Sequence, residues 1–199
     1  MRLYLIRHGQ AEWQVERSGD LDGPLTFLGH QQAGKAARWL ADKGAEVCAE
    51  RRVTRLFTSP LQRATQTSWY FETTMGLKGE VRAELKEAIF RVADQLPRRS
   101  CPFSPVTCYT IPVAYKEFKQ QALFALKFLF DAADGVDGNV IAITHGGLIK
   151  TMLRVVAGSD DLCFDIFNAA VTVLDWRHGR WHLMHLNFWD HLSPEFRSR

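Results

Sequence analysis

The chain has 199 residues, of which 46% are hydrophobic and 12% aromatic, so it can bury a sizeable core and is not dominated by disorder. Its 25 Lys and Arg residues are interspersed with 22 Asp and Glu residues, which gives a net charge of +3. The absence of long single-sign runs disfavours a nucleic-acid groove and favours a small anionic molecule as the binding partner.

No stretch of the sequence is apolar for the roughly 18 residues that a membrane span needs. The first apolar run is interrupted at Arg7 and is too short for a signal peptide. We therefore expect a cytoplasmic protein with no membrane partner. The cysteines show no zinc-like spacing and are expected to be reduced; pairing of Cys101 with Cys108, in a proline-rich stretch, is left open.

The first half of the chain alternates between strand-like and helix-like patterns. Thr26 can cap a helix and Gly44 can stop it, and another helix is expected to end near Gly76. The predicted elements are a strand at 3–6, a helix at 26–43, a strand at 55–59, a helix at 61–74 and a strand at 81–87.

The second half begins with a proline-rich segment at about 88–116, which we interpret as an irregular lid or insertion. A helix at 116–133, a strand at 139–144 and a helix from 146 to about 156 are predicted next. The segments 171–176 and 181–186 are predicted to form a hairpin whose turn contains Gly179.

These patterns predict a single α/β domain over residues 1–199. Alternating strands and helices favour a mostly parallel central sheet with helices on both faces, and the C-terminal hairpin adds antiparallel strands. Arg7-His8 and His145 both follow predicted strands. Ligands of open α/β sheets bind at the carboxyl ends of the strands, so these residues are expected to meet in one site.

The residues expected at this edge suit phosphoryl transfer. A phosphoryl group has three charged oxygens, and planar guanidinium groups such as those of Arg7 and Arg63 can hold them in pairs. His145 adds a third donor, and the helix that opens at Gly146 adds main-chain N–H groups and a positive dipole end. This set needs no metal or other cofactor.

His8 is the candidate nucleophile, because nearby arginines disfavour its protonated form. A leaving alkoxide needs a proton, which Glu87 at the end of the third predicted strand can supply. Glu84, three residues earlier, is the alternative acid if the strand register differs.

The sequence Arg7-His8-Gly9 after an N-terminal strand resembles the signature of the histidine phosphatase superfamily, which includes the phosphoglycerate mutases. Segment 22–33 is similar to that family's D-x-P-L-T-x-x-G-x-x-Q-A stretch. Further likeness lies in 58–67, around Arg63, in 85–87, which ends at Glu87, and in 144–147, which contains His145.

The resemblance implies a phosphoglycerate mutase-like fold with His8 as the phosphorylated nucleophile and Glu87 as the proton donor. It also implies that Arg7, Arg63 and His145 form the phosphate pocket. Three positions depart from the family pattern. Gln14 stands where many members have Asn, which leaves its phosphate contact open; Ala11 replaces a common Thr; and the residues after Glu87 lack the F-G-x-W-E-G continuation.

We therefore predict a metal-independent phosphomonoesterase that acts on a small phosphorylated metabolite. A mutase that uses the same phosphohistidine is the first alternative, and a non-catalytic sensor of a phosphorylated ligand is the second. Trp13 is a candidate for lining the pocket. His178, His182 and His185 are not expected to bind a metal together, because they do not share one strand face. A homo-oligomer is compatible with the sequence.

Overall fold

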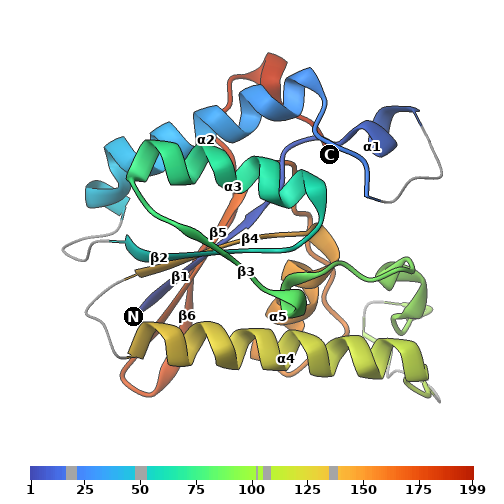
Figure 1. Cartoon of the computed structure of the whole chain (residues 1–199). Coiled ribbons are helices and arrows are strands. Elements are labelled where there is room, and N and C mark those ends of the chain that lie inside the picture. Colours follow the sequence, from blue (N-terminus) through green and yellow to red (C-terminus); the bar gives the residue numbers. More distant parts are fainter. Residues whose placement is uncertain (17–21, 48–52, 102, 105–108, 135–138) are drawn as a thin grey trace.

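The computed structural model describes residues 1–16, 22–47, 53–101, 103–104, 109–134 and 139–199. A six-stranded sheet in the order β3-β2-β4-β1-β5-β6 forms its centre (Figure 1). Its strands are β1 (Arg2–Arg7), β2 (Val53–Thr58), β3 (Gly79–Val81), β4 (Asn139–Thr144), β5 (Val171–Arg177) and β6 (Arg180–Phe188). The first four are parallel, and β5 and β6 are antiparallel, as predicted.

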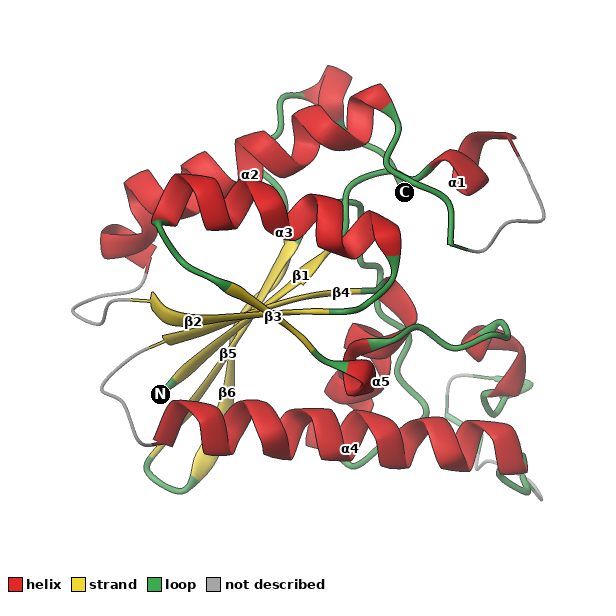
Figure 2. Ribbon diagram, in the orientation of Figure 1, coloured by secondary structure: helices red, strands yellow, loops and turns green. Residues whose placement is uncertain are grey.

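Helices cover both faces of this sheet (Figure 2). α2 (Phe27–Val47) and α3 (Gln62–Met75) lie on one face, and α4 (Val113–Asp134) and α5 (Gly146–Ala157) lie on the other. The strand β1 shows how the two cores arise, since alternate side chains of a strand point to opposite faces. Leu3 and Leu5 pack in the core under α4 and α5, whereas Tyr4 and Ile6 pack in the core under α2 and α3.

Local chemistry predicts two of three helix ends correctly, and also the hairpin turn. The Thr26 hydroxyl accepts the main-chain N–H of Gly29 at 3.0 Å and caps α2. Gly76 ends α3 in the left-handed conformation, at φ 66°, and the hairpin turn holds Gly179 at φ 72°. The predicted stop at Gly44 is wrong, because α2 continues to Val47. A glycine inside a helix costs only about 1 kcal/mol, which tertiary packing can override.

The third strand was predicted at 81–87, but only Val81 of that range lies in a strand. β3 ends at Val81, a 3₁₀ helix follows at Ala83–Leu85, and Glu87 lies in the loop after it. The sequence alternates apolar and polar residues here, as a strand does, but of its apolar residues the turn buries only Leu85, whereas Val81 and Ala83 are exposed. The Thr144 hydroxyl donates to the Leu85 carbonyl at 2.7 Å, so the loop is attached to the end of β4.

The described residues of the proline-rich segment before Pro112 form no regular element apart from a 3₁₀ helix at Val92–Gln95. Its predicted end is wrong by a few residues, since α4 begins at Val113 directly after Pro112. Cys101 and Cys163 carry free, exposed thiols, and Cys108 lies outside the described residues. None of the described helices is both long enough and apolar enough to cross a membrane.

Candidate active site

Two histidines meet at the carboxyl edge of the sheet because β1 and β4 are parallel neighbours. Arg7 pairs with Thr144 at the ends of these strands. His8 follows β1 directly, and His145 follows β4 directly. Their ring centroids lie 5.1 Å apart, with the ring planes inclined at 59°. The juxtaposition expected from the sequence is present.

The hydrogen bonds of His8 define which ring nitrogen is free to react. Nδ1 lies 2.6 Å from the carbonyl oxygen of Gly9, which can only accept, so Nδ1 carries the hydrogen. Nε2 is then the unprotonated nitrogen, and it accepts a hydrogen bond from Nε of Arg63 at 3.1 Å. Burial, followed by the charges of His145, Arg7 and Arg63, holds the pKa of His8 well below 6.5.

The main chain around His8 is held by side chains from distant elements. The Gly9 N–H donates to the Thr67 hydroxyl at 3.1 Å, and the Asn168 amide donates to the His8 carbonyl at 3.3 Å. A Cβ atom on Gly9 would lie 2.3 Å from the Gly29 carbonyl oxygen, so a glycine is required there. Nothing in the sequence had singled out Thr67 or Asn168 for such a role.

Two guanidinium groups lie near His8: that of Arg7, the preceding residue, and that of Arg63 on α3. Nη1 of Arg7 donates to the Ile166 carbonyl at 2.6 Å, and its buried Nε has no partner among the described residues. Burial lowers the pKa of Arg7 to about 10, so it remains charged at neutral pH. Arg63 lies in the first turn of α3, 5.7 Å from the ring of Trp13, which places Trp13 beside the site.

Of the two ring nitrogens of His145, Nε2 contacts Ser59 and Nδ1 is left for a ligand. Nε2 lies 2.8 Å from the Ser59 hydroxyl, and Ser59 also accepts the N–H of Leu61 at 3.3 Å. Nδ1 is buried and has no partner in the described part of the chain. If Ser59 donates its hydroxyl hydrogen to Nε2, Nδ1 carries the ring hydrogen and can donate it to an anion. Burial and the charges of Arg63 and Arg7 lower the pKa of His145 well below 6.5.

Glu87 is positioned by the start of α5 rather than by a strand. Its Oε2 accepts the Gly147 N–H at 2.8 Å, and its Oε1 accepts the Ala88 N–H at 3.0 Å. Burial raises its pKa above 4.5, although those two hydrogen bonds and the charges of Arg7 and Arg63 oppose the shift. Such a carboxyl group can hold a proton and release it. The alternative acid, Glu84, is exposed, and Gln121 binds its main-chain carbonyl group.

Gln14 is engaged in a network behind His8. Its Nε2 donates to Asn168 and to the Arg199 carbonyl, both at 3.2 Å, and its Oε1 accepts the Ala11 N–H at 2.9 Å. A phosphate contact of Gln14 therefore stays a prediction. Gly146 lies next to Arg7, since a Cβ atom there would meet Arg7 Cδ at 3.5 Å.

One cation near the site was not expected from the sequence. Lys150 lies one turn after Gly146 on α5, and burial, together with the charge of Arg7, lowers its pKa. In the described ranges no three His, Cys, Asp or Glu side chains are grouped closely enough to hold a metal ion. His178, His182 and His185 lie on the β5–β6 hairpin, away from this edge.

Fold and site together define an α/β protein in which the guanidinium groups of Arg7 and Arg63 lie beside a buried, neutral histidine. The sequence model of the histidine phosphatase superfamily (branch 1) matches residues 3–104 and 110–188 of this chain. The chain belongs to this family.

Individual relatives are distant. A probable phosphoglycerate mutase of Yersinia enterocolitica is 30% identical over 102 residues, which are 50% of this chain and 44% of that protein. Phosphoglycerate mutase-like protein 4 of Arabidopsis thaliana is 24% identical over 187 residues, which cover 86% of this chain and 77% of the relative. The chain thus spans less than half of the first of these two relatives and about three quarters of the second.

Solved structures share the fold at low identity. Bacillus stearothermophilus YhfR gives a TM-score of 0.72 at 22% identity and covers 96% of this chain and 98% of its own. A putative alpha-ribazole-5'-P phosphatase from Escherichia coli gives 0.73 at 19% identity, covering 97% and 100%. A phosphoserine phosphatase mutant from Entamoeba histolytica, solved with phosphoserine, gives 0.67 at 21% identity, covering 96% and 99%.

Proposed function

We propose that the chain is a phosphomonoesterase that hydrolyses a small phosphorylated metabolite through a phosphohistidine on His8. The observation that carries this proposal is the hydrogen bond from His8 Nδ1 to the Gly9 carbonyl, because it leaves the lone pair of Nε2 among the cations of the site. A neutral imidazole nitrogen in that position is a nucleophile ready for an in-line attack on phosphorus.

In the first step, Nε2 of His8 attacks phosphorus and the bond from phosphorus to the ester oxygen breaks. Arg63 turns from Nε2 to the phosphoryl oxygens, and Arg7, His145 and the Gly146 N–H hold the same group. Glu87 transfers its proton to the departing alkoxide. In the second step the Glu87 carboxylate takes a proton from water, the hydroxide attacks phosphorus, and Nε2 of His8 leaves.

The names of several proteins of similar fold support hydrolysis, since they include phosphatases for phosphoserine and alpha-ribazole-5'-phosphate. Residues 1–199 would form one domain, with the proline-rich segment between Glu87 and α4 covering the substrate. The names of the curated relatives favour the alternative, a phosphoglycerate-type mutase that returns the phosphoryl group to a second hydroxyl.

The phosphohistidine can be detected directly. The protein is mixed with a phosphomonoester in the presence of a chelator and quenched in alkali, where phosphohistidine persists, and the peptide with residue 8 is weighed. We expect one added phosphoryl group on His8, and phosphate release that falls by at least about 10³-fold in His8→Ala. His178→Asn, in the exposed hairpin turn, is the control. Phosphate release that persists in His8→Ala would exclude the mechanism.

Hydrolase and mutase differ in where the phosphoryl group goes. We expect labelled phosphate to appear in water from phosphorylated sugars, glycerates or phosphoserine, without a bisphosphorylated activator. Transfer of label between the two hydroxyls of a glycerate, faster than its release to water, would instead identify the mutase.

A further inference from the structure

A cavity lies between α4 and α5, at the end of α5 that is remote from the histidines. Its volume is about 400 Å³, within the range of small-molecule sites. Three cations line it, Lys116, Lys119 and Arg154, together with the apolar side chains of Ile111, Leu123 and Val155. We call these six residues and the space between them the α4–α5 cleft.

Arg154 is the unusual member of this set, because it is charged and only 2% exposed. Its Nε donates to the Leu162 carbonyl at 2.9 Å. Its Nη1 is buried and has no hydrogen-bond partner among the described residues. A buried guanidinium with an unused donor is costly, and an anion bound there would offset that cost.

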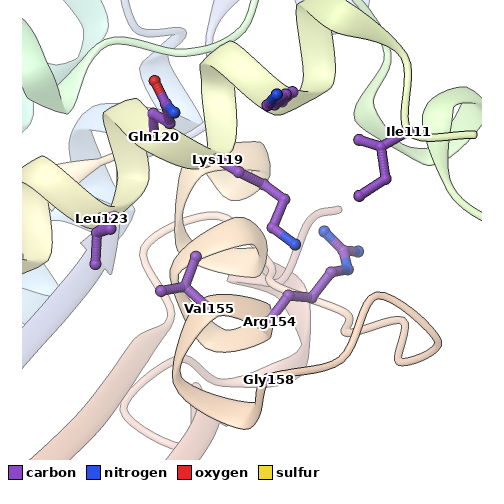
Figure 3. A pocket seen from close by; sticks show the side chains of 8 residues that line it. Ile111, Lys119, Gln120, Leu123, Arg154, Val155 and Gly158 are labelled. Atoms are coloured by element: carbon purple, nitrogen blue, oxygen red, sulfur yellow. The ribbon is translucent and has the colours of Figure 1, made fainter.

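The side chains converge on one space (Figure 3). Lys119 reaches from α4 and Arg154 from α5, so that their charged ends approach each other, with Ile111 beyond them on one side. Leu123 and Val155 lie at the other end of the cleft. The cleft therefore has a cationic centre and apolar walls.

Asp160 is a carboxylate that binds one of the three cations of the cleft. Asp160 accepts the Lys119 ammonium group at 2.8 Å through Oδ2 and the Tyr115 hydroxyl at 2.7 Å through Oδ1. Arg154 also interacts with the Tyr115 hydroxyl and with the charge of Asp160, but its Nη1 still has no hydrogen-bond partner among the described residues.

This cleft is distinct from the active site. Arg154 follows Gly146 by eight positions on one helix, which separates them by about 12 Å along the axis at 1.5 Å per residue. None of the groups that surround His8 lines the cleft.

We propose that the α4–α5 cleft binds a small organic anion, with its carboxylate or phosphate group at Arg154 and Lys119 and its apolar part against Ile111, Leu123 and Val155. Charge alone would suit inorganic phosphate, but the apolar walls favour a molecule that also removes apolar surface from water.

The test uses octanoate and octyl phosphate as probes, with 1-octanol and inorganic phosphate as comparisons. They are titrated into the ¹⁵N-labelled chain saturated with orthovanadate, which blocks the active site. We expect saturable amide shifts in residues 116–123 and 154–158 with both octyl anions, and binding at least roughly tenfold weaker with octanol and with phosphate. The tighter of the two anions identifies the preferred head group.

Substitutions then assign the binding to the cleft. Arg154→Met and Lys119→Met are each expected to weaken octyl-anion binding by roughly tenfold or more. Lys127→Met, on the exposed side of α4, is the matched control and should bind as the unaltered chain does. If Arg154→Met fails to fold, Leu123→Asp takes its place, because Leu123 is 52% exposed and a carboxylate there would repel the probe.

Three results would overturn the proposal. These are equal binding of 1-octanol, unchanged affinity in the folded cleft variants, and amide shifts that appear around residues 8 and 145 instead of the cleft.

Discussion

Glu87 accepts hydrogen bonds from two main-chain N–H groups and has a raised pKa. As the proposed acid, it matters only when the leaving group needs a proton. This makes its contribution depend on the substrate. An alkoxide needs the proton, whereas p-nitrophenolate is stable enough to leave without it.

We expect Glu87→Gln to slow the hydrolysis of an alkyl phosphate by about 10²–10⁴-fold. With p-nitrophenyl phosphate, the initial burst of nitrophenol should keep nearly its normal rate, while steady turnover slows because water activation also uses Glu87. Stopped-flow absorbance separates the two phases. Glu84→Gln, at the exposed neighbouring carboxyl group, is the control. A burst that slows as much as the alkyl reaction would refute the role of Glu87 as the acid.

The pH dependence follows from the same two groups. In the proposed mechanism His8 must be neutral and Glu87 protonated. The pKa of His8 lies well below 6.5, so the rate is lost only when the pH falls to that lowered pKa. The pKa of Glu87 lies above 4.5, so the alkyl reaction slows as pH rises through that raised pKa. We expect kcat/KM for the alkyl phosphate to decline on the alkaline side, and the nitrophenol burst to show no such decline. An identical alkaline decline in both would contradict this assignment.

At the scale of the elements, the N-terminus of α5 places the acid. A Cβ atom on Gly147 would lie 2.4 Å from Glu87 Oε1 and 3.0 Å from its Cδ, so the carboxyl group would have to move. The same atom on Gly146 would meet only the Arg7 side chain, at an ordinary contact distance of 3.5 Å. The two adjacent glycines thus serve different purposes.

We expect Gly147→Ala to reduce kcat for an alkyl phosphate by roughly 10–100-fold, since a misplaced acid loses its alignment. Gly146→Ala should lose clearly less. Steady-state kinetics of the two variants, with thermal unfolding to verify that both fold, provide the comparison. Equal losses would show that Glu87 is not held by α5 in the way described.

At the scale of the whole molecule, the buried histidines make the fold sensitive to acid. His191 donates to the Ala169 carbonyl through Nε2 and stacks on Trp39, and burial lowers its pKa to about 4. Its pKa in the unfolded chain is near 6.5. Between these values the unfolded chain binds a proton that the folded chain does not, so stability falls as pH falls below 6.5. His8 and His145 act in the same direction.

The free energy of unfolding should fall between pH 7 and pH 5 in both proteins. We expect this fall to be about 2 kcal/mol smaller in His191→Asn than in the unaltered chain. Chemical denaturation at several pH values measures this. His178→Asn, in the exposed turn, should leave the pH dependence unchanged. An unaltered slope in His191→Asn would mean that this histidine is protonated in the folded state.

The sequence alone predicted the sheet, the helices on both faces and the meeting of His8 with His145, because these depend on local pattern and on strand connectivity. It predicted a strand up to Glu87, because apolar and polar residues alternate there although the chain forms a 3₁₀ turn. It also ended α2 at Gly44, whereas the helix runs to Val47, since a glycine inside a helix costs only about 1 kcal/mol.

The residue types and their order along the chain are thus sufficient to indicate phosphoryl chemistry. Only the tertiary structure decided that Gly147 holds Glu87, that Asn168 holds the His8 carbonyl and that Arg154 is buried with an unused donor. Each of these contacts joins segments that are far apart in the chain or depends on burial. Hydrophobic periodicity reports on one element at a time and therefore cannot reveal them.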